Sequence, residues 1–356
     1  MKVITIVGAR PQFIKSAPVS AAFQEVGIKE LIIHTGQHYD SNMSAVFFDE
    51  MNLPQPIYRL NCGGLSHSEM IGNMLLKLTP ILRDEAPDYV LVYGDTNSTL
   101  AGALAATKLQ IPLIHVEAGL RSYNLDMPEE MNRILTDRMS SILFTPSLNA
   151  VENLHKEGFK HFDCTITEIG DVMFDALLKF QSISRWTPEM GAKEFFDEDF
   201  GLVTVHRFEN INDRQRLTQL VEELNDVHKN RLALWMPLHP ATSNKLDAFD
   251  LELNIYTAPP VGYLQMLWLL KKCKIVFTDS VGLQKEAYFS KKPFVTLREQ
   301  TEWVELLESG CNRLHHIGKT NLNQLLAEML SVQLDFSMTG YGTGNAAKKI
   351  AQYLSQ

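Results

Sequence analysis

The sequence predicts an α/β protein made of two Rossmann-like, doubly wound domains that face each other across a cleft. Along the first half of the chain, short apolar runs alternate with amphipathic or alanine-rich segments, which is the pattern of a parallel sheet with helices on both faces. The alternation starts again after about Gly170. The length of 356 residues also exceeds one ordinary core and indicates two domains of roughly 150–200 residues each.

The first domain is expected to span residues 1–170. Its predicted strands are the apolar runs Val3–Val7, Leu31–His34, Tyr89–Tyr93 and Ile111–Val116. Its predicted helices are Gln12–Glu25, a short helix around Ser44–Met51, Met70–Glu85, Ser98–Lys108 and Glu130–Ser141. Pro11 fits a first helical turn, where the missing N–H of proline costs nothing. The chain start is too lightly charged for a signal peptide and is interpreted as the first strand.

The second domain is expected to span residues 171–343. Its predicted strands are Gly201–Val205, Leu232–Met236, Lys274–Thr278 and Phe294–Leu297. A helix is predicted from about Gly282, and Tyr263–Leu270 is predicted as a helix packed in the core. The stretch Gln181–Phe200 contains no obvious strand and lies near the boundary. Ligands of doubly wound sheets bind outside the carboxyl ends of the strands, so residues that follow strands are the site candidates.

Composition excludes several classes of protein. Apolar residues make up 45% of the chain and charged residues 21%, which is ordinary for a soluble globular protein, and no apolar run approaches the ~20 residues of a membrane span. The four cysteines lie far apart without CxxC spacing, so we expect no disulfide framework, no metal site and a reducing cytoplasm. The net charge of −9 argues against nucleic acid as a partner but leaves an anionic small substrate open.

Four carboxylates follow predicted strands within a short part of the chain. They are Asp95, Glu117 and the pair Glu129–Glu130. Crowding carboxylates into one cleft is unfavourable and is tolerated mainly where the chemistry moves protons. A single Asp or Glu would be interpreted as a solvated loop charge, but clusters on three successive loops favour acid/base groups at the rim of a sheet.

Two cations follow the first strand. Arg10 and Lys15 lie in the first turns of a predicted helix, whose N-terminus already favours anions. The segment is not a GxGxxG fingerprint, so a nicotinamide cofactor is not indicated. A position of Lys15 on a solvated helix face is an equally open alternative.

The second domain contains a candidate phosphate site. A strand ends at Thr278, and backbone N–H groups at Ser280 and Gly282 open a helix where a diphosphate could bind. Glu286, one turn further, could accept hydrogen bonds from ribose hydroxyls. An ordinary helix N-cap by Asp279 or Ser280 is compatible with this site.

Three further strand ends carry cations or histidines. His206-Arg207 follow one strand, and His239 follows another as a weaker case of the same kind. Arg298 ends a third strand and fits a sugar–phosphate site, with a structural ion pair to Glu299 or Glu302 as the alternative.

Together these segments resemble the non-hydrolysing UDP-N-acetylglucosamine 2-epimerase family. The matching motifs occur in the family's order and cover nearly the whole chain: Gly8–Lys15, Gly94–Asn97, His115–Arg121, Pro128–Arg133, His206–Asn210 and Asp279–Ala287. The resemblance implies a glycosyltransferase-B-like fold, a homodimer, no cofactor, and a C-terminal helix at about 344–356 that returns to the first domain.

The resemblance also implies the site residues. Its catalytic candidates are Asp95, Glu117, Glu129, Arg133, His206 and Lys15. Its candidates for binding the UDP-sugar are Arg10, Gln37, His38, His239, Ser280, Gly282, Glu286 and Arg298. The residues leave open which carboxylate takes the proton.

Gln12-Phe13 and Thr301–Glu305 resemble the branch that acts on UDP-2,3-diacetamido-2,3-dideoxyglucuronate. Three positions depart from the family's pattern. Val281 replaces one of two adjacent glycines, which makes a phosphate-binding loop bulkier, and Ala241 stands where relatives often have arginine. Tyr39-Asp40 differ from the pattern of substrate-activated enzymes, so allosteric activation is not expected.

The implied reaction inverts carbon 2 of a UDP-sugar for surface polysaccharide synthesis, such as that of lipopolysaccharide O-antigen. The hydrogen at C2 is not acidic until the anomeric C–O bond breaks, so elimination of UDP to a 2-acetamidoglycal and re-addition is the expected route. Three alternatives remain: an enzyme that converts UDP-N-acetylglucosamine to UDP-N-acetylmannosamine, a glycosyltransferase of the same architecture, and a catalytically silent protein that binds nucleotide sugars.

Overall fold

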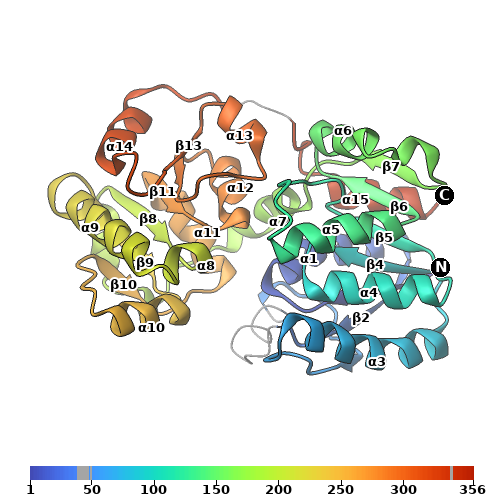
Figure 1. The fold of residues 1–356 in the computed structure, drawn as a ribbon. Helices are drawn as coiled ribbons and strands as arrows, with labels where there is room; N and C mark the ends of the chain where they lie inside the picture. Colours follow the sequence, from blue (N-terminus) through green and yellow to red (C-terminus); the bar gives the residue numbers. More distant parts are fainter. Residues whose placement is uncertain (38–47, 49, 337–339) are drawn as a thin grey trace. The chain divides into compact units, whose positions relative to one another are not determined.

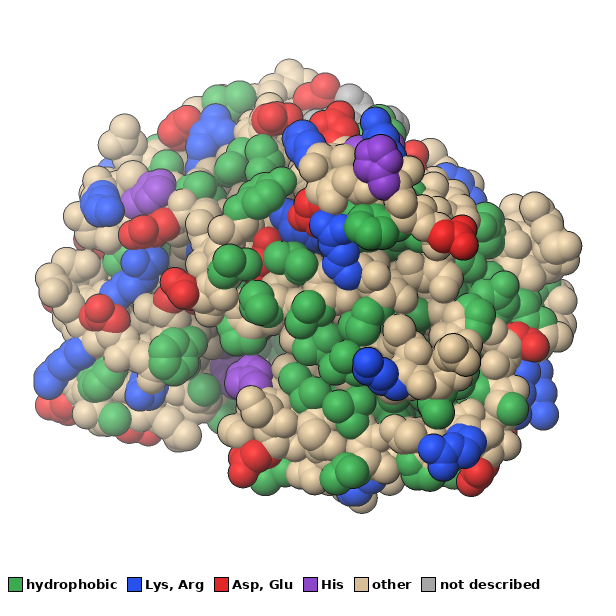
Figure 2. Space-filling view, turned by 45° about the vertical axis from the view of Figure 1, so that its right-hand side comes forward, with side chains coloured by type: hydrophobic (Ala, Val, Ile, Leu, Met, Phe, Trp, Pro, Cys, Tyr) green, Lys and Arg blue, Asp and Glu red, His purple; other side chains and the backbone are tan. Residues whose placement is uncertain are grey.

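The computed structural model describes residues 1–37, 48, 50–336 and 340–356. Contacts divide the chain into two compact units, Met1–Lys179 with Thr339–Gln356, and Phe180–Met338 (Figure 1). Most of the short helix predicted around Ser44–Met51 lies outside the described residues, as do His38 and Tyr39-Asp40. No helix within the described ranges is long and apolar enough to cross a membrane. On the face shown in Figure 2, basic side chains are scattered among acidic and apolar ones.

The first unit is built on a seven-stranded parallel sheet with the order β3-β2-β1-β4-β5-β6-β7. The strands are β1 (Lys2–Val7), β2 (Lys29–His34), β3 (Tyr58–Arg59), β4 (Tyr89–Tyr93), β5 (Leu113–Val116), β6 (Ile142–Thr145) and β7 (Thr165–Glu168). The order reverses between β1 and β4, because the chain first adds strands on one side of β1 and later on the other. Such a switch point opens a crevice at the carboxyl ends of the two strands.

Helices cover both faces of this sheet (Figure 1). They are α1 (Arg10–Val26), α3 (His67–Glu85), α4 (Asn97–Lys108), α5 (Pro128–Met139), α6 (Leu148–Lys156), α7 (Val172–Phe180) and α15 (Ala346–Leu354). Helix α4 packs close to the sheet because it is rich in alanine and glycine. A Cβ atom at Gly102 would lie 3.0 Å from side-chain atoms of both Ile6 and Val92.

The C-terminal helix α15 packs against α1 in the first unit. Its N-terminus is held by Asp175 of α7, whose carboxylate accepts hydrogen bonds from the N–H groups of Ala346 (3.2 Å) and Ala347 (2.9 Å). Burial raises the pKa of Asp175 above its ordinary value, although these two backbone bonds act in the opposite direction. A carboxylate far away in the sequence therefore caps the last helix.

Replacing Asp175 with alanine is expected to lower the free energy of unfolding by about 0.5–2 kcal/mol, the usual cost of a lost helix cap. The two N–H groups of α15 would lose their acceptor in a buried place. Urea unfolding measures the difference. Alanine at the exposed Asp88, which accepts only the Lys2 N–H in the described chain, is the comparison. Equal stability of wild type and the Asp175 variant would contradict the capping role.

The second unit is built on a six-stranded parallel sheet with the order β10-β9-β8-β11-β12-β13. The strands are β8 (Phe200–Thr204), β9 (Ala233–Pro237), β10 (Tyr256–Ala258), β11 (Ile275–Thr278), β12 (Phe294–Thr296) and β13 (Asn312–Leu314). The helices are α8 (Phe208–Ile211), α9 (Arg214–Asn230), α10 (Pro240–Phe249), α11 (Tyr263–Lys272), α12 (Val281–Phe289), α13 (Val304–Glu308) and α14 (Leu322–Ser331). The order again reverses, here between β8 and β11.

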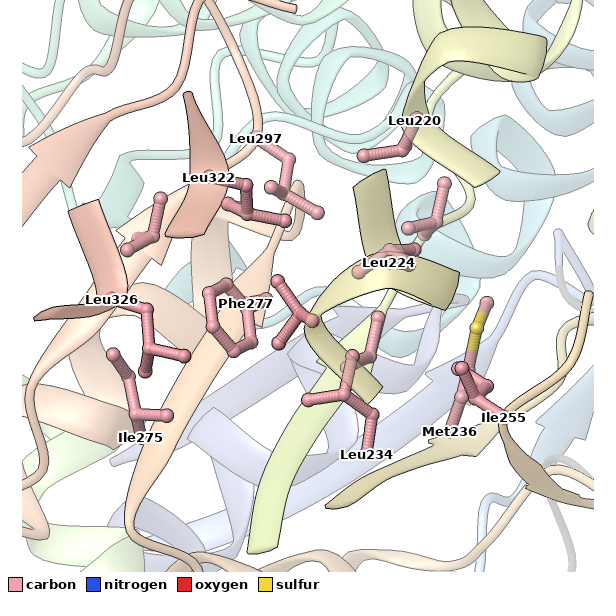
Figure 3. Close-up of a cluster of buried hydrophobic side chains, with 14 of the residues drawn as sticks. Leu220, Leu224, Leu234, Met236, Ile255, Ile275, Phe277, Leu297, Leu322 and Leu326 are labelled. Atoms are coloured by element: carbon pink, nitrogen blue, oxygen red, sulfur yellow. The ribbon is translucent and has the colours of Figure 1, made fainter. Parts of the chain in front are cut away.

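The core of the second unit lies between this sheet and helices α9 and α14. Figure 3 shows Phe277 of β11 at its centre, with Leu220 and Leu224 of α9 on one side and Leu322 and Leu326 of α14 on the other. All are fully or almost fully buried. Helix α9 meets the sheet through apolar residues spaced three and four apart, the pattern of a helix with one buried face.

The structure contains all eight predicted strands, each shifted by two residues or fewer at either end. The helix predicted at Tyr263–Leu270 is α11, which is almost wholly buried. The stretch Gln181–Phe200 holds only short 3₁₀ turns before β8 begins at its last residue. Five short strands escaped prediction, namely β3, β6, β7, β10 and β13. The fold class of two doubly wound α/β units is confirmed.

Candidate active site

The carboxyl edge of the first sheet brings together five of the predicted site residues. Asp95 follows β4, Glu117 follows β5, and Glu129 lies in the first turn of α5. Strands β4 and β5 are parallel neighbours, so their following loops lie side by side. Lys15 reaches this edge from α1, and Arg133 reaches it from α5.

Lys15 and Glu117 form a buried ion pair. The Lys15 ammonium donates to Oε2 of Glu117, and only 11% and 7% of the two side chains are exposed. The alternative of Lys15 on a solvated helix face is therefore wrong. Glu117 has a backbone φ of 74°, a strained conformation for a residue other than glycine that is common at functional sites.

Asp95 faces Arg133, with 3.7 Å between its Oδ2 and a guanidinium nitrogen. Burial raises the pKa of Asp95 above its ordinary value; Arg133 and Lys15 lower it, and Glu117 and Glu129 raise it further. The side chain keeps 35% of its surface exposed. Asp95 is thus an accessible carboxyl whose pKa lies above its ordinary value, which suits a group that exchanges protons.

Glu129 and Glu130 have different environments although they are adjacent. Glu130 is fully buried and accepts the backbone N–H groups of Ser122 (3.0 Å) and Tyr123 (2.9 Å). It also pairs with Arg133 at 3.1 Å. These contacts hold the loop before α5. Glu129 is half-buried and lies close enough to Asp95 to affect its pKa, so it is the member of the pair available for chemistry.

Two glutamines shape the backbone around these groups. The Gln12 amide bonds to the N–H groups of Gly8 (2.8 Å) and Ala9 (3.1 Å), and to the carbonyl of Tyr93 (3.0 Å). It therefore joins the turn after β1 to the end of β4. Gln37 accepts from the backbone N–H and the hydroxyl of Ser98, at 3.0 and 2.8 Å, in the first turn of α4. Arg10 is half-buried at the start of α1.

In the second unit, His206 is held by the buried carboxylate of Asp279. The ring Nδ1 lies 3.0 Å from Oδ1, and the backbone N–H groups of His206 and Arg207 donate to the same carboxylate, as does the Asn210 amide. Burial would raise the pKa of Asp279, but His206 and the other donors outweigh it and the pKa is lowered. Because Nδ1 contacts Asp279, Nε2 is the ring nitrogen that can face a ligand. The His206 side chain is 36% exposed.

The ring of His239 lies 5.7 Å from that of His206, in an edge-to-face arrangement. It also caps its own helix, because its Nδ1 accepts the N–H of Ala241 at 3.2 Å. The two histidines therefore share one end of the second sheet, at the carboxyl ends of β8 and β9.

The N-terminus of α12 has the expected form. Ser280 is its N-cap and accepts from the Leu283 N–H at 3.4 Å. Val281 is half-buried, and its carbonyl accepts the indole N–H of Trp303 at 3.0 Å. This hydrogen bond stabilises the first turn of α12. None of the residues that the structure describes has an atom within 4 Å of a Cβ placed at Gly282, which leaves space beside the backbone. Glu286 is buried one turn further along.

Arg298 is buried in a cluster of ion pairs. It is 2% exposed and donates to both oxygens of Glu302, at 2.9 and 3.3 Å, and to Glu209 at 3.3 Å. The structural ion pair with Glu302 is therefore present. The other alternative partner, Glu299, instead lies near Arg216 (3.4 Å) and Lys319 (3.8 Å).

Several residues that organise the site are not among those predicted from the sequence. Asn132 donates to the Asp95 carbonyl at 2.8 Å, and Asp279 was considered only as a helix cap. His115 and Asp137, both fully buried, were assigned no role. Their signal was available in part, because Asn132 and His115 lie within motifs that also contain the predicted carboxylates.

Comparison with known proteins gives full-length matches. A family profile described as UDP-N-acetylglucosamine 2-epimerase matches residues 21–355. The UDP-2,3-diacetamido-2,3-dideoxy-D-glucuronate 2-epimerase of Pseudomonas aeruginosa is 46% identical over 357 residues, with 100% of both chains covered. The crystal structure of Methanocaldococcus jannaschii UDP-GlcNAc 2-epimerase in complex with UDP-GlcNAc and UDP has a TM-score of 0.92 at 39% identity, covering 100% of this chain and 99% of that one.

The Neisseria meningitidis UDP-GlcNAc 2-epimerase bound to UDP-GlcNAc has a TM-score of 0.89 at 30% identity, with 100% of both chains covered. These similarities confirm the resemblance found in the motifs and the glycosyltransferase-B-like fold class. The chain belongs to the UDP-N-acetylglucosamine 2-epimerase family.

Proposed function

We propose that this protein is a non-hydrolysing 2-epimerase that converts UDP-2,3-diacetamido-2,3-dideoxy-glucuronate to its manno epimer. The observation that carries the proposal is the cluster at the carboxyl edge of the first sheet, where Lys15 pairs with Glu117 and Arg133 faces Asp95. Two acid/base carboxyls beside two cations are the groups that inversion of an unactivated C–H centre needs.

The first half of the reaction is an elimination. A carboxylate takes the C2 proton, the C2–H electron pair forms the C1=C2 double bond, and the anomeric C–O bond breaks with its electrons on the UDP phosphate. The helix start at Ser280–Gly282 supplies backbone N–H groups for the diphosphate. His206, oriented by Asp279, stabilises the charge that develops on the leaving oxygen.

The second half returns UDP to C1 of the 2-acetamidoglycal and delivers a proton to C2 from the opposite face. Two carboxyl groups on different loops can serve the two faces. Glu117 is proposed as the group that takes the proton, because its pairing with Lys15 holds it in the ionised form that can accept one. Asp95, whose pKa is raised by burial, is proposed as the group that returns a proton. We assign supporting roles in this proton transfer to Glu129 and Arg133.

The uronate is proposed because of the Pseudomonas aeruginosa relative. The branch motifs contribute less. The Gln12 amide is hydrogen-bonded to the backbone of Gly8, Ala9 and Tyr93, and the Trp303 indole N–H to the Val281 carbonyl. We therefore assign neither group to direct contact with a sugar carboxylate. UDP-N-acetylglucosamine, with UDP-N-acetylmannosamine as product, is the second candidate because solved relatives of this chain bind it.

Exchange in deuterated water tests both activity and substrate. The enzyme is incubated with UDP-2,3-diacetamido-2,3-dideoxy-glucuronate, its 6-hydroxymethyl counterpart or UDP-N-acetylglucosamine, without any acceptor, and deuterium at C2 is followed by NMR. We expect fastest incorporation with the uronate. Faster exchange with UDP-N-acetylglucosamine would establish the second candidate. Binding of UDP-sugar without exchange would favour a silent binding protein, and transfer only with an acceptor would favour a glycosyltransferase.

We also propose a cytoplasmic homodimer that needs no cofactor and supplies surface polysaccharide synthesis, such as that of O-antigen. The support is the family resemblance and the nucleotide substrate. Light scattering of the purified chain tests the dimer, and a mass of about 40 kDa for the particle, equal to the 40.3 kDa chain, would overturn it.

Replacing Gly94 with alanine is expected to lower the exchange rate by roughly 10²-fold. A Cβ there would lie 3.1 Å from Glu117 Oε2 and 3.2 Å from Lys15 Nζ, so the ion pair must shift. Gly27 has a similar backbone (φ 75° against 62°), and a Cβ placed there meets no atom of another described residue within 4 Å. Its alanine variant carries the same backbone strain and should retain the exchange rate. Equal rates in both variants would contradict this prediction.

A further inference from the structure

A buried histidine–carboxylate pair lies behind the acid/base cluster. His115 of β5 and Asp137 of α5 are fully buried, and their Nδ1 and Oδ1 atoms lie 2.7 Å apart. On the other side of the ring, Nε2 lies 2.7 Å from the carbonyl oxygen of Gly94. The reaction proposed above uses neither residue.

The pair joins three separate segments. The second oxygen of Asp137 accepts the N–H of Gly119 at 3.2 Å and a guanidinium N–H of Arg121 at 2.7 Å. His115 holds the Gly94 carbonyl. Asp95 is the residue after Gly94, Glu117 lies two residues before Gly119, and α5 itself provides Glu129 and Arg133. One hydrogen-bonded unit therefore contacts every segment that carries an acid/base candidate.

The surroundings of the ring also bear on which of its nitrogens carry protons. Both of its nitrogens face acceptors, a carboxylate and a carbonyl, so a ring that satisfies both carries a proton on each nitrogen. Nearby charges balance such a cation. Arg121 pairs with Asp137, and it also donates to the two oxygens of Glu157 at 2.6 and 2.8 Å. A charged His115 and Arg121 would therefore face two carboxylates, those of Asp137 and Glu157. Buried charges are tolerated when they are paired in this way.

We propose that His115 and Asp137 are positioning residues, and that a doubly protonated His115 fixes the Gly94 carbonyl and thereby the placement of Asp95 relative to Glu117. This inference rests on the proposed function, because it concerns the same reaction. Placement matters since a shift of about 1 Å at reacting groups can cost roughly 10²-fold in rate.

Two variants separate positioning from general stability. Asparagine at position 115 places an amide N–H near the position of Nδ1 and keeps the bond to Asp137, whereas glutamine places it near Nε2 and keeps the bond to Gly94. We expect His115→Asn to lower kcat for C2 exchange by roughly 10²-fold with KM unchanged, and His115→Gln to lower it clearly less. A structural role predicts the reverse order, because glutamine removes the donor from the buried charge of Asp137.

His315 provides the matched control in the second unit. It is also fully buried, with Nε2 at 2.6 Å from Glu223 and Nδ1 at 2.8 Å from Thr320. His315→Asn should lower the melting temperature without changing kcat. Loss of kcat in proportion to melting temperature in all three variants would overturn the proposal.

Two readouts do not depend on activity. Nitrogen-15 NMR of histidine-labelled wild type should show both ring nitrogens of His115 protonated at neutral pH, and a singly protonated ring would overturn the proposal. Amide deuteration at 94–95 should be faster in His115→Asn than in His115→Gln, and equal rates would also overturn it. If the wild type exchanges the C2 hydrogen of none of the UDP-sugars tested, the proposed function fails. These two readouts would still decide the positioning role.

Discussion

Glu117→Gln is expected to reduce C2 exchange by roughly 10²–10⁴-fold, the contribution of a positioned proton-transfer group. The amide has nearly the size of the carboxylate but takes up no proton. It also leaves the ammonium of Lys15, whose side chain is 11% exposed, without this counter-charge. UDP affinity should stay nearly intact, because His206 and the helix start at Ser280–Gly282, which are proposed to hold the diphosphate, belong to the second unit.

The measurement pairs deuterium incorporation at C2 with calorimetric UDP binding. Glu152→Gln is the matched control, since Glu152 is 66% exposed and lies 4.0 Å from Lys156 on the surface; it should retain both activities. Circular dichroism must show that Glu117→Gln is folded at the assay temperature. A folded variant that exchanges at the wild-type rate would remove Glu117 from the site.

The second large effect is expected for Asp279→Asn. One oxygen of Asp279 accepts from the backbone N–H groups of His206 and Arg207 and from the Asn210 amide. An asparagine oxygen at that place carries no charge, and a hydrogen bond to a charged group contributes about 1.5–3 kcal/mol against about 0.5–1.5 kcal/mol for a neutral pair. We therefore expect a loss of at least about 3 kcal/mol in the free energy of unfolding. His206 also loses the partner that orients it, so kcat should fall by roughly 10²–10³-fold.

The pH dependence of stability identifies the cause of this loss. The pKa of Asp279 is lower in the folded protein than its ordinary value. Its ionised form therefore stabilises the fold above the ordinary pKa of about 3.9, and this contribution is lost as the pH falls through the folded pKa. The stability difference between wild type and Asp279→Asn should shrink in acid. Asp213→Asn, an exposed N-cap of α9 where asparagine serves equally well, should change stability little at any pH.

Elements that bury apolar residues on both faces were predictable from the sequence. Tyr89–Tyr93 and Ile275–Phe277 are continuous apolar runs, as expected for central strands of parallel sheets. The polar edge strand β7, with the sequence TITE and partly exposed throughout, has no such signal. Helix α9 is not among the predicted elements, although Leu217, Leu220, Leu224 and Val227 repeat at helical spacing and so carry a local signal.

The candidate site was predictable as a set of residue types, and the pairing within it was not. The carboxylates could be found because they follow apolar runs, whereas the partner of Lys15 lies 102 residues away. Asp279 and Arg298 show the same limit. Each follows a strand, and only the packing shows that one holds His206 while the other is occupied by Glu302.

By itself, the sequence determined the alternation of strands and helices, the two units of doubly wound type and the family, because these depend on periodicity and on motifs that are local in the chain. The tertiary structure decided which polar groups meet. Strand order sets which loops become neighbours, and burial then requires each charge to find a partner. For this reason Lys15 meets Glu117, and His115 joins Gly94 to Asp137.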